Sequence, residues 1–243
     1  MNVILFMANV LKVEDLITSY KGFSVKDVSF TLKSGDVFGL IGSSGSGKST
    51  VMNSILGVKK FDIGKVSFLV DGEEASLKEN VGYSSQGNAL FPYLTLEENI
   101  MTFGRIYGLK KRVIKQRISL LLKLMGLENA GNKRIIELSG GMAKRADLIV
   151  ALIHDPKVLI LDEPFAGLDI ALVNFLWKTI KYLAEQGRII IISSHSLYDI
   201  KKNCTKIGFI VDGSYYSYEE MMKKTGRTRN DPLESLFLKM GVG

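Results

Sequence analysis

Cysteine is almost absent from this chain, since Cys204 is the only one among 243 residues. An internal disulfide is therefore impossible, and a reducing cytoplasm is the simplest compartment. Long apolar runs are also missing: the longest, at 3–8 and 149–153, fall far short of the roughly 20 residues that a membrane-spanning helix needs. We expect the chain not to cross a membrane. No basic leader precedes the first apolar residues, so we also expect no secretory signal.

Acidic residues are missing from one long stretch, because no Asp or Glu lies between Asn99 and Leu127. Much of the net charge of +7 is found there, on Arg105, Lys110, Lys111, Arg112, Lys115, Arg117 and Lys123. A surface for nucleic acid or anionic lipid is one interpretation. The solvent-exposed face of one helix is the other, and it is favoured by apolar residues at helical spacing, namely Ile114, Ile118, Leu121 and Met125. We prefer the second interpretation and expect no nucleic-acid partner.

The succession of apolar patterns predicts an α/β domain without repeats or low-complexity segments. Residues 11–42 are β-rich, residues 95–153 are mostly helical, and strands alternate with helices again from 157 to 211, which is typical of a mainly parallel sheet. We expect helices over 142–153 and 169–186, strands over 64–72, 157–162, 188–193 and 207–211, and a short amphipathic helix after a polar loop at 225–231. His154 is interpreted as part of a turn.

Residues 42–49 match the phosphate-binding pattern GxxxxGK[ST]. Glycines let the backbone curl so that several N–H groups converge on a polyphosphate. Lys48 can place its charge on the β- and γ-phosphates, and the Ser49 hydroxyl can bind Mg²⁺. A chance match is the alternative in a chain rich in Gly and Ser, but an apolar strand pattern precedes the loop and a helical pattern with Val51, Met52, Ile55 and Leu56 follows it.

Two carboxylates, Asp162 and Glu163, end the apolar strand pattern at 158–161. Open α/β sheets bind their ligands at the carboxyl ends of strands. Asp162 is suited to holding Mg²⁺ directly or through water, and Glu163 to orienting or deprotonating a water that attacks a γ-phosphate. An acidic cluster at a helix N-terminus is the alternative, which the nearby Pro164 would allow.

The segment Leu138-Ser139-Gly140-Gly141-Met142 begins a predicted helix, and Ser139 lies 23 residues before Asp162. Read alone it is a flexible helix cap. With this segment in this position, the chain resembles the ATP-binding-cassette (ABC) ATPases over essentially its whole length, because their signature is an LSGGQ-like loop before the acidic strand. Met142 departs from the usual Gln, and Ser43 departs from a common Pro in the phosphate-binding loop.

The resemblance implies a P-loop NTPase (RecA-like) fold with a mainly parallel sheet core, an antiparallel β subdomain and an inserted α-helical subdomain. The whole chain, 1–243, would be one nucleotide-binding domain, with its core in 1–86 and 156–225, the helical subdomain in 87–155 and a tail in 226–243. Two such domains would dimerise head to tail, so that ATP and Mg²⁺ lie between the P-loop of one protomer and the signature of the other. The implied ATP-binding residues are Tyr20, Gly42, Ser43, Ser44, Gly45, Ser46, Gly47, Lys48, Ser49, Thr50, Ser139, Gly140, Gly141 and Asp169.

Individual positions match further family roles. Gln86 resembles the glutamine that contacts Mg²⁺ and the attacking water, so that Ser49, Gln86 and Asp162 are the expected metal residues and Glu163, His195 and Gln86 the expected catalytic ones. His195 resembles the switch histidine that contacts the γ-phosphate and steadies Glu163. A strand-end glutamine is more often polar surface, and a histidine after a strand is more often structural.

Two matches carry a second interpretation. Asp169 resembles the loop that crosses to the other protomer, although an Asp at a helix start is also an ordinary cap. Tyr20 resembles the aromatic residue that stacks on adenine, although it is equally suited to a strand surface. The segment from Gln86 to Thr95 resembles the part that meets a membrane partner, while Phe91 and Tyr93 could instead pack within the helical subdomain.

We therefore expect the ATP-hydrolysing subunit of a membrane transporter, bound to a separate permease at the cytoplasmic face of the membrane. Residues 103–109 and 233–238 are most similar to ATPase subunits of multidrug-type exporters. The alternative is a soluble ABC ATPase, in iron–sulfur cluster assembly or another mechanical role. A nucleotide sensor that does not hydrolyse ATP is a third possibility, which Glu163 opposes because a catalytic base is present. The sequence does not identify the transported substrate or the partner cassette.

Overall fold

A computed structural model describes residues 9–20 and 22–226 of the chain. The apolar run at 3–8, the exporter-like segment at 233–238 and the short helix expected after residue 231 lie outside the described residues. Within the described ranges, no helix is both long enough and apolar enough to cross a bilayer.

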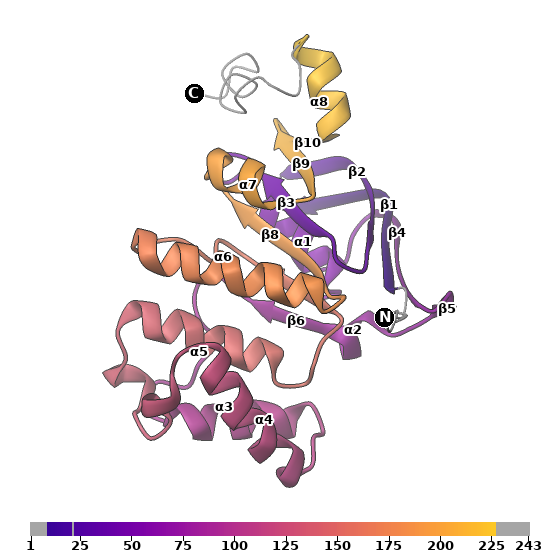
Figure 1. The fold of residues 1–243 in the computed structure, drawn as a ribbon. Coiled ribbons are helices and arrows are strands. Elements are labelled where there is room, and N and C mark those ends of the chain that lie inside the picture. Colours follow the sequence, from indigo (N-terminus) through magenta and orange to yellow (C-terminus); the bar gives the residue numbers. More distant parts are fainter. Residues whose placement is uncertain (1–8, 21, 227–243) are drawn as a thin grey trace, which may run out of the picture.

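The described strands join in one mixed ten-stranded sheet with the order β5-β4-β1-β2-β10-β9-β3-β8-β7-β6 (Figure 1). They are β1 (Asn9–Tyr20), β2 (Phe23–Lys33), β3 (Val37–Ile41), β4 (Ile63–Val70), β5 (Glu73–Glu74), β6 (Val81–Ser84), β7 (Val158–Leu161), β8 (Ile189–Ser194), β9 (Lys206–Val211) and β10 (Ser214–Ser217). Strands β9, β3, β8, β7 and β6 are parallel to one another, whereas β1, β2, β4 and β5 form antiparallel pairs. Strand β10 pairs antiparallel with β9 and parallel with β2. The expected parallel core with an antiparallel β region is confirmed.

Helices cover both faces of the parallel strands. The helices of the described residues are α1 (Lys48–Ile55), α2 (Leu77–Asn80), α3 (Leu96–Ile106), α4 (Lys111–Leu124), α5 (Gly140–Leu152), α6 (Ile170–Glu185), α7 (Leu197–Asn203) and α8 (Tyr218–Thr225), with 3-10 turns at Glu128–Ala130 and Ile135–Glu137. Figure 1 shows α6 and α7 in front of the parallel strands, with α3, α4 and α5 gathered below them.

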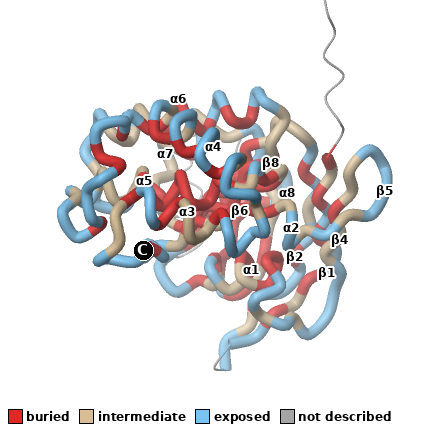
Figure 2. The backbone as a smooth tube through the Cα atoms, turned by 90° about the horizontal axis from the view of Figure 1, so that it is seen from below, coloured by how far each residue is buried: buried red, intermediate tan, exposed pale blue. Residues whose placement is uncertain are grey.

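Two apolar cores explain why the central strands have continuous apolar sequences. Successive side chains of a strand point to opposite faces, so Ile190 and Ile192 of β8 pack in the core beneath α6, and Ile189 and Ile191 pack in the core beneath α1. All four are fully buried. Figure 2 shows buried backbone in the middle of the molecule and exposed backbone around its rim. This double coverage makes the sheet a rigid support for the loops at its edge.

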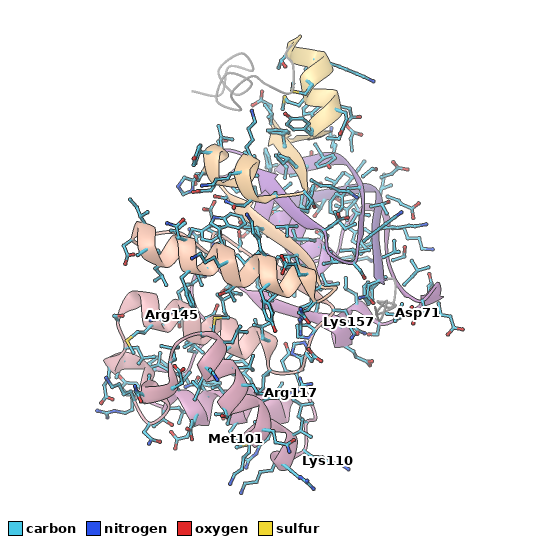
Figure 3. The ribbon with its side chains drawn as sticks, viewed as in Figure 1. Asp71, Met101, Lys110, Arg117, Arg145 and Lys157 are labelled. Carbon is cyan, nitrogen blue, oxygen red and sulfur yellow. The ribbon has the colours of Figure 1, made fainter. Side chains whose placement is uncertain are left out.

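The basic stretch lies on the surface, as the preferred interpretation predicts. Six of its seven cations are exposed and only Arg117 is half-buried, while Ile114, Ile118 and Met125 face the core. Figure 3 shows Lys110 at the outer edge of the helical region. The expectation of a single helix was wrong, because a turn with Gly108 at φ 74° separates α3, which carries Arg105, from α4.

Most of the predicted helices and strands are present, and a few elements were missed. Predicted helices and strands agree within about two residues at most ends, which is the usual uncertainty of helix boundaries. Strand β10 and helix α8 were missed, and α8 ends at Thr225, the first residue of the predicted polar loop. His154 follows α5 in a turn as expected, but its ring also stacks on Tyr107 at a centroid distance of 3.7 Å.

Candidate active site

Several of the predicted site residues lie where parallel strands end. Strand β3 leads into the loop 42–47, β7 ends directly before Asp162, and β8 ends directly before His195. Because β3, β7 and β8 are adjacent and parallel, their carboxyl ends share one edge of the sheet. This edge is the place where an open α/β sheet binds its ligand.

The loop 42–47 is curled tightly against the rest of the fold. Gly47 has φ 106°, a conformation that favours glycine, and it precedes the first turn of α1. A Cβ on Gly42 would lie 2.3 Å from Ser46 Oγ and 2.8 Å from the Ile210 carbonyl oxygen. Side chains at these positions would push the loop open, so the glycines of the pattern are required by the observed backbone.

Lys48 occupies the centre of this loop. Its Nζ donates to the carbonyl oxygens of Gly42 at 2.8 Å and of Ser43 at 3.1 Å, and the residue is 7% exposed. The buried Ser46 Oγ has no hydrogen-bond partner among the described residues. A buried cation and an unpartnered hydroxyl beside a helix N-terminus fit a phosphate group, which accepts hydrogen bonds from all three.

The Glu163 carboxylate lies between the Lys48 ammonium group and the His195 imidazole. Its Oε1 is 3.6 Å from Lys48 Nζ, and its Oε2 is 2.9 Å from Nδ1 of His195. The Glu163 side chain is only 14% exposed, whereas that of His195 is 74% exposed. The structure therefore brings together three residues that are far apart in the sequence, with the imidazole on the open side of the carboxylate.

Ser193, which the sequence reasoning missed, connects the two carboxylates. Its hydroxyl donates to Asp162 Oδ1 at 2.5 Å and accepts from the Glu163 N–H at 2.8 Å. Asp162 is 3% exposed and Ser193 is fully buried. Two serines at the end of the apolar strand β8 were the available signal, because polar residues ending a buried strand point to a site at the sheet edge.

The site has the donor set of a hard cation rather than of zinc. The expected metal residues, Ser49, Gln86 and Asp162, offer a hydroxyl, an amide oxygen and a carboxylate, which are the ligands that Mg²⁺ prefers. Among the described residues there is no group of three His, Cys, Asp or Glu side chains that would hold a transition metal by itself. Mg²⁺ in such sites is held by few protein ligands together with substrate phosphates, and these residues fit that arrangement.

The signature segment forms the beginning of α5. Ser139 is its N-cap, with Oγ accepting from the Met142 N–H at 3.3 Å. Gly140 is exposed, and a Cβ on Gly141 would lie 2.5 Å from the Leu172 side chain of α6. Asp169 caps α6 in the same way, accepting from Leu172 N–H at 2.9 Å. The two segments are neighbours, and both capping interpretations are confirmed.

Gln86 follows β6 and is exposed. It lines a small hollow of about 190 Å³ with Gly140, Lys144, Gly167 and Leu168, so the Gln86 loop meets the signature helix and the loop before α6. No hydrogen bond or ion pair within the described ranges joins Gln86 or Ser139 to the phosphate-binding loop. Because β6 runs parallel to β7, Gln86 lies at the same edge of the sheet as Asp162, and its loop also meets the signature helix.

The other predicted nucleotide contacts are at the rim. Ser43, Ser44, Gly45 and Ser49 are exposed, and Thr50 is half-buried in α1. Tyr20, at the end of β1, is 53% exposed. These positions are accessible to a ligand that lies across the loop.

The segment expected to meet a membrane partner is also accessible. Tyr93 is 76% exposed and Phe91 is 44% exposed. Phe91 packs beside Phe103 with ring centroids 5.7 Å apart, so packing within the helical region accounts for part of its surface. Asn99 is fully buried and fixes the backbone here, because its amide bonds both the N–H and the carbonyl of Phe91.

Comparison with known proteins places this arrangement in a family. The family model described as "ABC transporter" matches residues 25–166. The linearmycin resistance ATP-binding protein LnrL of Bacillus subtilis (strain 168) is 37% identical over 207 residues, covering 84% of this chain and 67% of that protein. The Nod factor export ATP-binding protein I of Rhizobium sp. (strain N33) is 36% identical over 192 residues, covering 78% and 63%. The chain thus spans about two thirds of the length of these relatives.

Solved structures agree with the sequence matches. An ATP-binding subunit of an ABC transporter superposes with a TM-score of 0.82 at 26% identity, covering 96% of this chain and 99% of that one. A nucleotide-free ATP-binding cassette from an ABC transporter, 22% identical, shares the fold with a TM-score of 0.79. The matching segment 25–166 contains the phosphate-binding loop, the signature and both strand-end carboxylates. The chain therefore belongs to the ABC transporter family, as an ATP-binding cassette.

Proposed function

We propose that this chain is the MgATP-hydrolysing subunit of an exporter-type ABC transporter. The observation that carries the proposal is the position of the Glu163 carboxylate, 2.9 Å from His195 Nδ1 and 3.6 Å from Lys48 Nζ. Hydrolysis of a γ-phosphate needs an oriented water and stabilisation of the charge that develops on the phosphoryl oxygens. A carboxylate beside a buried lysine at the end of a phosphate-binding loop offers both.

Each residue then has a separable role. The loop from Gly42 to Ser49 binds the phosphates with backbone N–H groups, and Lys48 neutralises their charge. Ser49, Asp162 and Gln86 would hold Mg²⁺, which would supply electrostatic stabilisation of the phosphates. Glu163 orients the water or accepts its proton, and His195 fixes the direction of the Glu163 carboxylate through the bond to Oε2. Tyr20 offers its ring to the base.

A complete site requires a second cassette. The signature helix start at Ser139 and Gly140 is exposed, and no hydrogen bond or ion pair among the described residues joins it to the phosphate-binding loop. Its backbone N–H groups suit phosphate oxygens, as helix N-termini do. A head-to-tail pair, with the partner being a copy of this chain or another cassette, would close each nucleotide between one loop and the opposite signature, with Asp169 beside the junction.

A membrane permease is the proposed recipient of the energy. The accessible segment around Phe91 and Tyr93 is its proposed contact, which would hold the subunit at the cytoplasmic face of the membrane. Export is supported by the relatives, because one is named for Nod factor export and another for linearmycin resistance. The core, helical and tail subdivision at 1–86 with 156–225, 87–155 and 226–243 is part of the same proposal.

Substitution Glu163→Gln tests the proposal. The amide keeps the size of the side chain but cannot accept a proton, so we expect kcat for ATP to fall by roughly 100- to 1,000-fold while MgATP binding stays within about threefold. Binding is measured by calorimetry and turnover by phosphate release. The exposed Glu128→Gln in the helical region is the matched control and should keep normal turnover. Normal turnover by Glu163→Gln would remove Glu163 from the mechanism.

A further inference from the structure

Asp147 is a buried carboxylate for which the proposed reaction has no role. It lies in α5, two turns after the signature, and is 2% exposed. Its neighbours in the helix, Ala146, Leu148 and Ile149, belong to the apolar core. Burial raises the pKa of Asp147, against the effect of its hydrogen bonds. A carboxylate in such a place is costly unless its oxygens are bonded.

Both oxygens of Asp147 are bonded to the segment that contains Gln86. The Ser84 hydroxyl donates to Oδ2 at 2.5 Å, and the Ala89 N–H donates to Oδ1 at 3.2 Å. One helical turn earlier, Lys144 Nζ donates to the Ser85 carbonyl oxygen at 2.9 Å. Two side chains of the signature helix therefore hold the segment 84–89 at three points, on both sides of Gln86.

The surrounding backbone makes this attachment close. Strand β6 and helix α5 are in direct contact (Figure 1). A Cβ on Gly82 would lie 2.1 Å from the Ala151 carbonyl oxygen, so only glycine fits between strand and helix there. Ser84 also accepts, through its own carbonyl oxygen, from the Asp162 N–H at 2.9 Å. Ser84 thus touches the signature helix with its side chain and the metal-binding strand end with its backbone.

We propose that Asp147 and Lys144 are positioning residues that fasten the segment 84–89 to the signature helix, so that Gln86 is placed by that helix. The inference rests on the proposed function, because it assigns the two residues to the same reaction. A displacement of the signature helix is then transmitted to Gln86 through hydrogen bonds to both flanks of its loop. Neither residue touches the phosphate-binding loop among the described contacts, so the contacts of that loop with the nucleotide do not depend on them.

The test is Asp147→Ala in the full chain, followed by hydrogen exchange and steady-state kinetics. The Ala89 amide loses its acceptor, so its exchange should accelerate by at least tenfold. Displacement of Gln86 should lower kcat by at least tenfold, with the KM for ATP within about twofold of wild type, because binding by the phosphate loop is unchanged. Asp147→Asn keeps an oxygen for the Ala89 N–H and should recover kcat to within about threefold.

Asp155→Asn is the matched control. Asp155 bonds Arg117 and Arg188 away from Gln86, so its substitution should leave both kcat and the exchange of Ala89 unchanged. Should Asp147→Ala fail to fold, Lys144→Met decides, because it removes the bond to the half-buried Ser85 and leaves both hydrogen bonds of Asp147 in place. It should show the same loss of kcat with the KM for ATP retained. Wild-type kcat in the variant, or a loss of kcat, ATP binding and thermal stability together, would overturn the proposal. Absence of hydrolysis by the wild-type chain would instead refute the proposed function, and the exchange of Ala89 would still test the attachment.

Discussion

Glu163 has an unusual backbone for its residue type, with φ 49°. The other non-glycine residues with positive φ in the described ranges are all aspartates, namely Asp15, Asp27, Asp71, Asp155 and Asp212. Aspartate tolerates this region because its short side chain bonds locally, whereas glutamate gains less. The conformation costs on the order of 1 kcal/mol, and the bond from the Glu163 N–H to Ser193 opposes that cost. The strained backbone is therefore that of the proposed catalytic residue, and the hydrogen bond to Ser193 holds Glu163 in this conformation.

Cys204 is a second residue whose environment determines its chemistry. Burial raises the pKa of its thiol to about 12, so almost no thiolate is present at neutral pH. We expect Cys204 in the folded protein to react with a disulfide reagent at pH 8 on the order of 1,000-fold more slowly than in the denatured chain. Absorbance of the released thiolate measures both rates. Rapid stoichiometric reaction of the native protein would contradict the raised pKa of this thiol.

Residues of the site differed in how far sequence could predict them. Lys48 and Asp162 were identifiable because each belongs to a short pattern whose spacing has a chemical reason. Ser193 and Asp147 were not, since their partners lie some 30 to 60 positions away and only the fold brings them together. A serine at the end of a strand and an aspartate within a helix are common, so their spacing in the sequence alone does not predict a role at the site.

Among the elements, the contact between β6 and α5 depends on one glycine. Gly82→Ala would place a methyl group 2.1 Å from a backbone oxygen that cannot move without bending α5. We expect this variant to lose about 3 kcal/mol of the free energy of unfolding, measured by denaturant titration. Gly87→Ala is the matched control, because its Cβ would have no neighbour within 4 Å. Equal stability of the two variants would show that strand and helix are not packed as described.

Elements were predictable where the apolar period was strong. The five residues of β3 are all buried and were expected as a strand, and Val51, Met52, Ile55 and Leu56 after the loop are buried as helical spacing predicts. Strand β10 was missed because its four residues pair with β9 in a hairpin, and such short pairing leaves little periodicity. The capping box of Ser217 and Glu220 was the sequence signal that could have predicted the start of α8.

At the scale of the whole molecule, the proposed nucleotide site between two cassettes predicts dimerisation. We expect Glu163→Gln, which binds but does not turn over, to shift from a monomer of 26.9 kDa to twice that mass when MgATP is added. Light scattering measures the mass with and without nucleotide. A mass that stays at one chain while ATP is bound would exclude pairing of this cassette with itself.

The proposed permease contact is testable because the one native cysteine, Cys204, is only partly exposed and its thiol has a raised pKa. A photoreactive maleimide on Tyr93→Cys should crosslink, in membranes, to a protein with several membrane spans, identified by mass spectrometry. The control is Val58→Cys, an equally exposed position (77% against 76%) that belongs to the turn after α1. Crosslinking of Tyr93→Cys to a soluble assembly protein instead would favour the non-transport alternative.

The position of β3 within the sheet also sets an order of folding. Val37 pairs with Ile190, and Phe38 pairs with Lys206, so both neighbours of this strand are encoded more than 150 residues later. By contrast, β1, β2 and β4 pair among themselves within the first 70 residues. Contacts between distant residues form late because closing a long loop is entropically costly. During synthesis, the phosphate-binding loop is therefore translated early but gains its support only when β8 and β9 have left the ribosome, so a truncated chain cannot form the site.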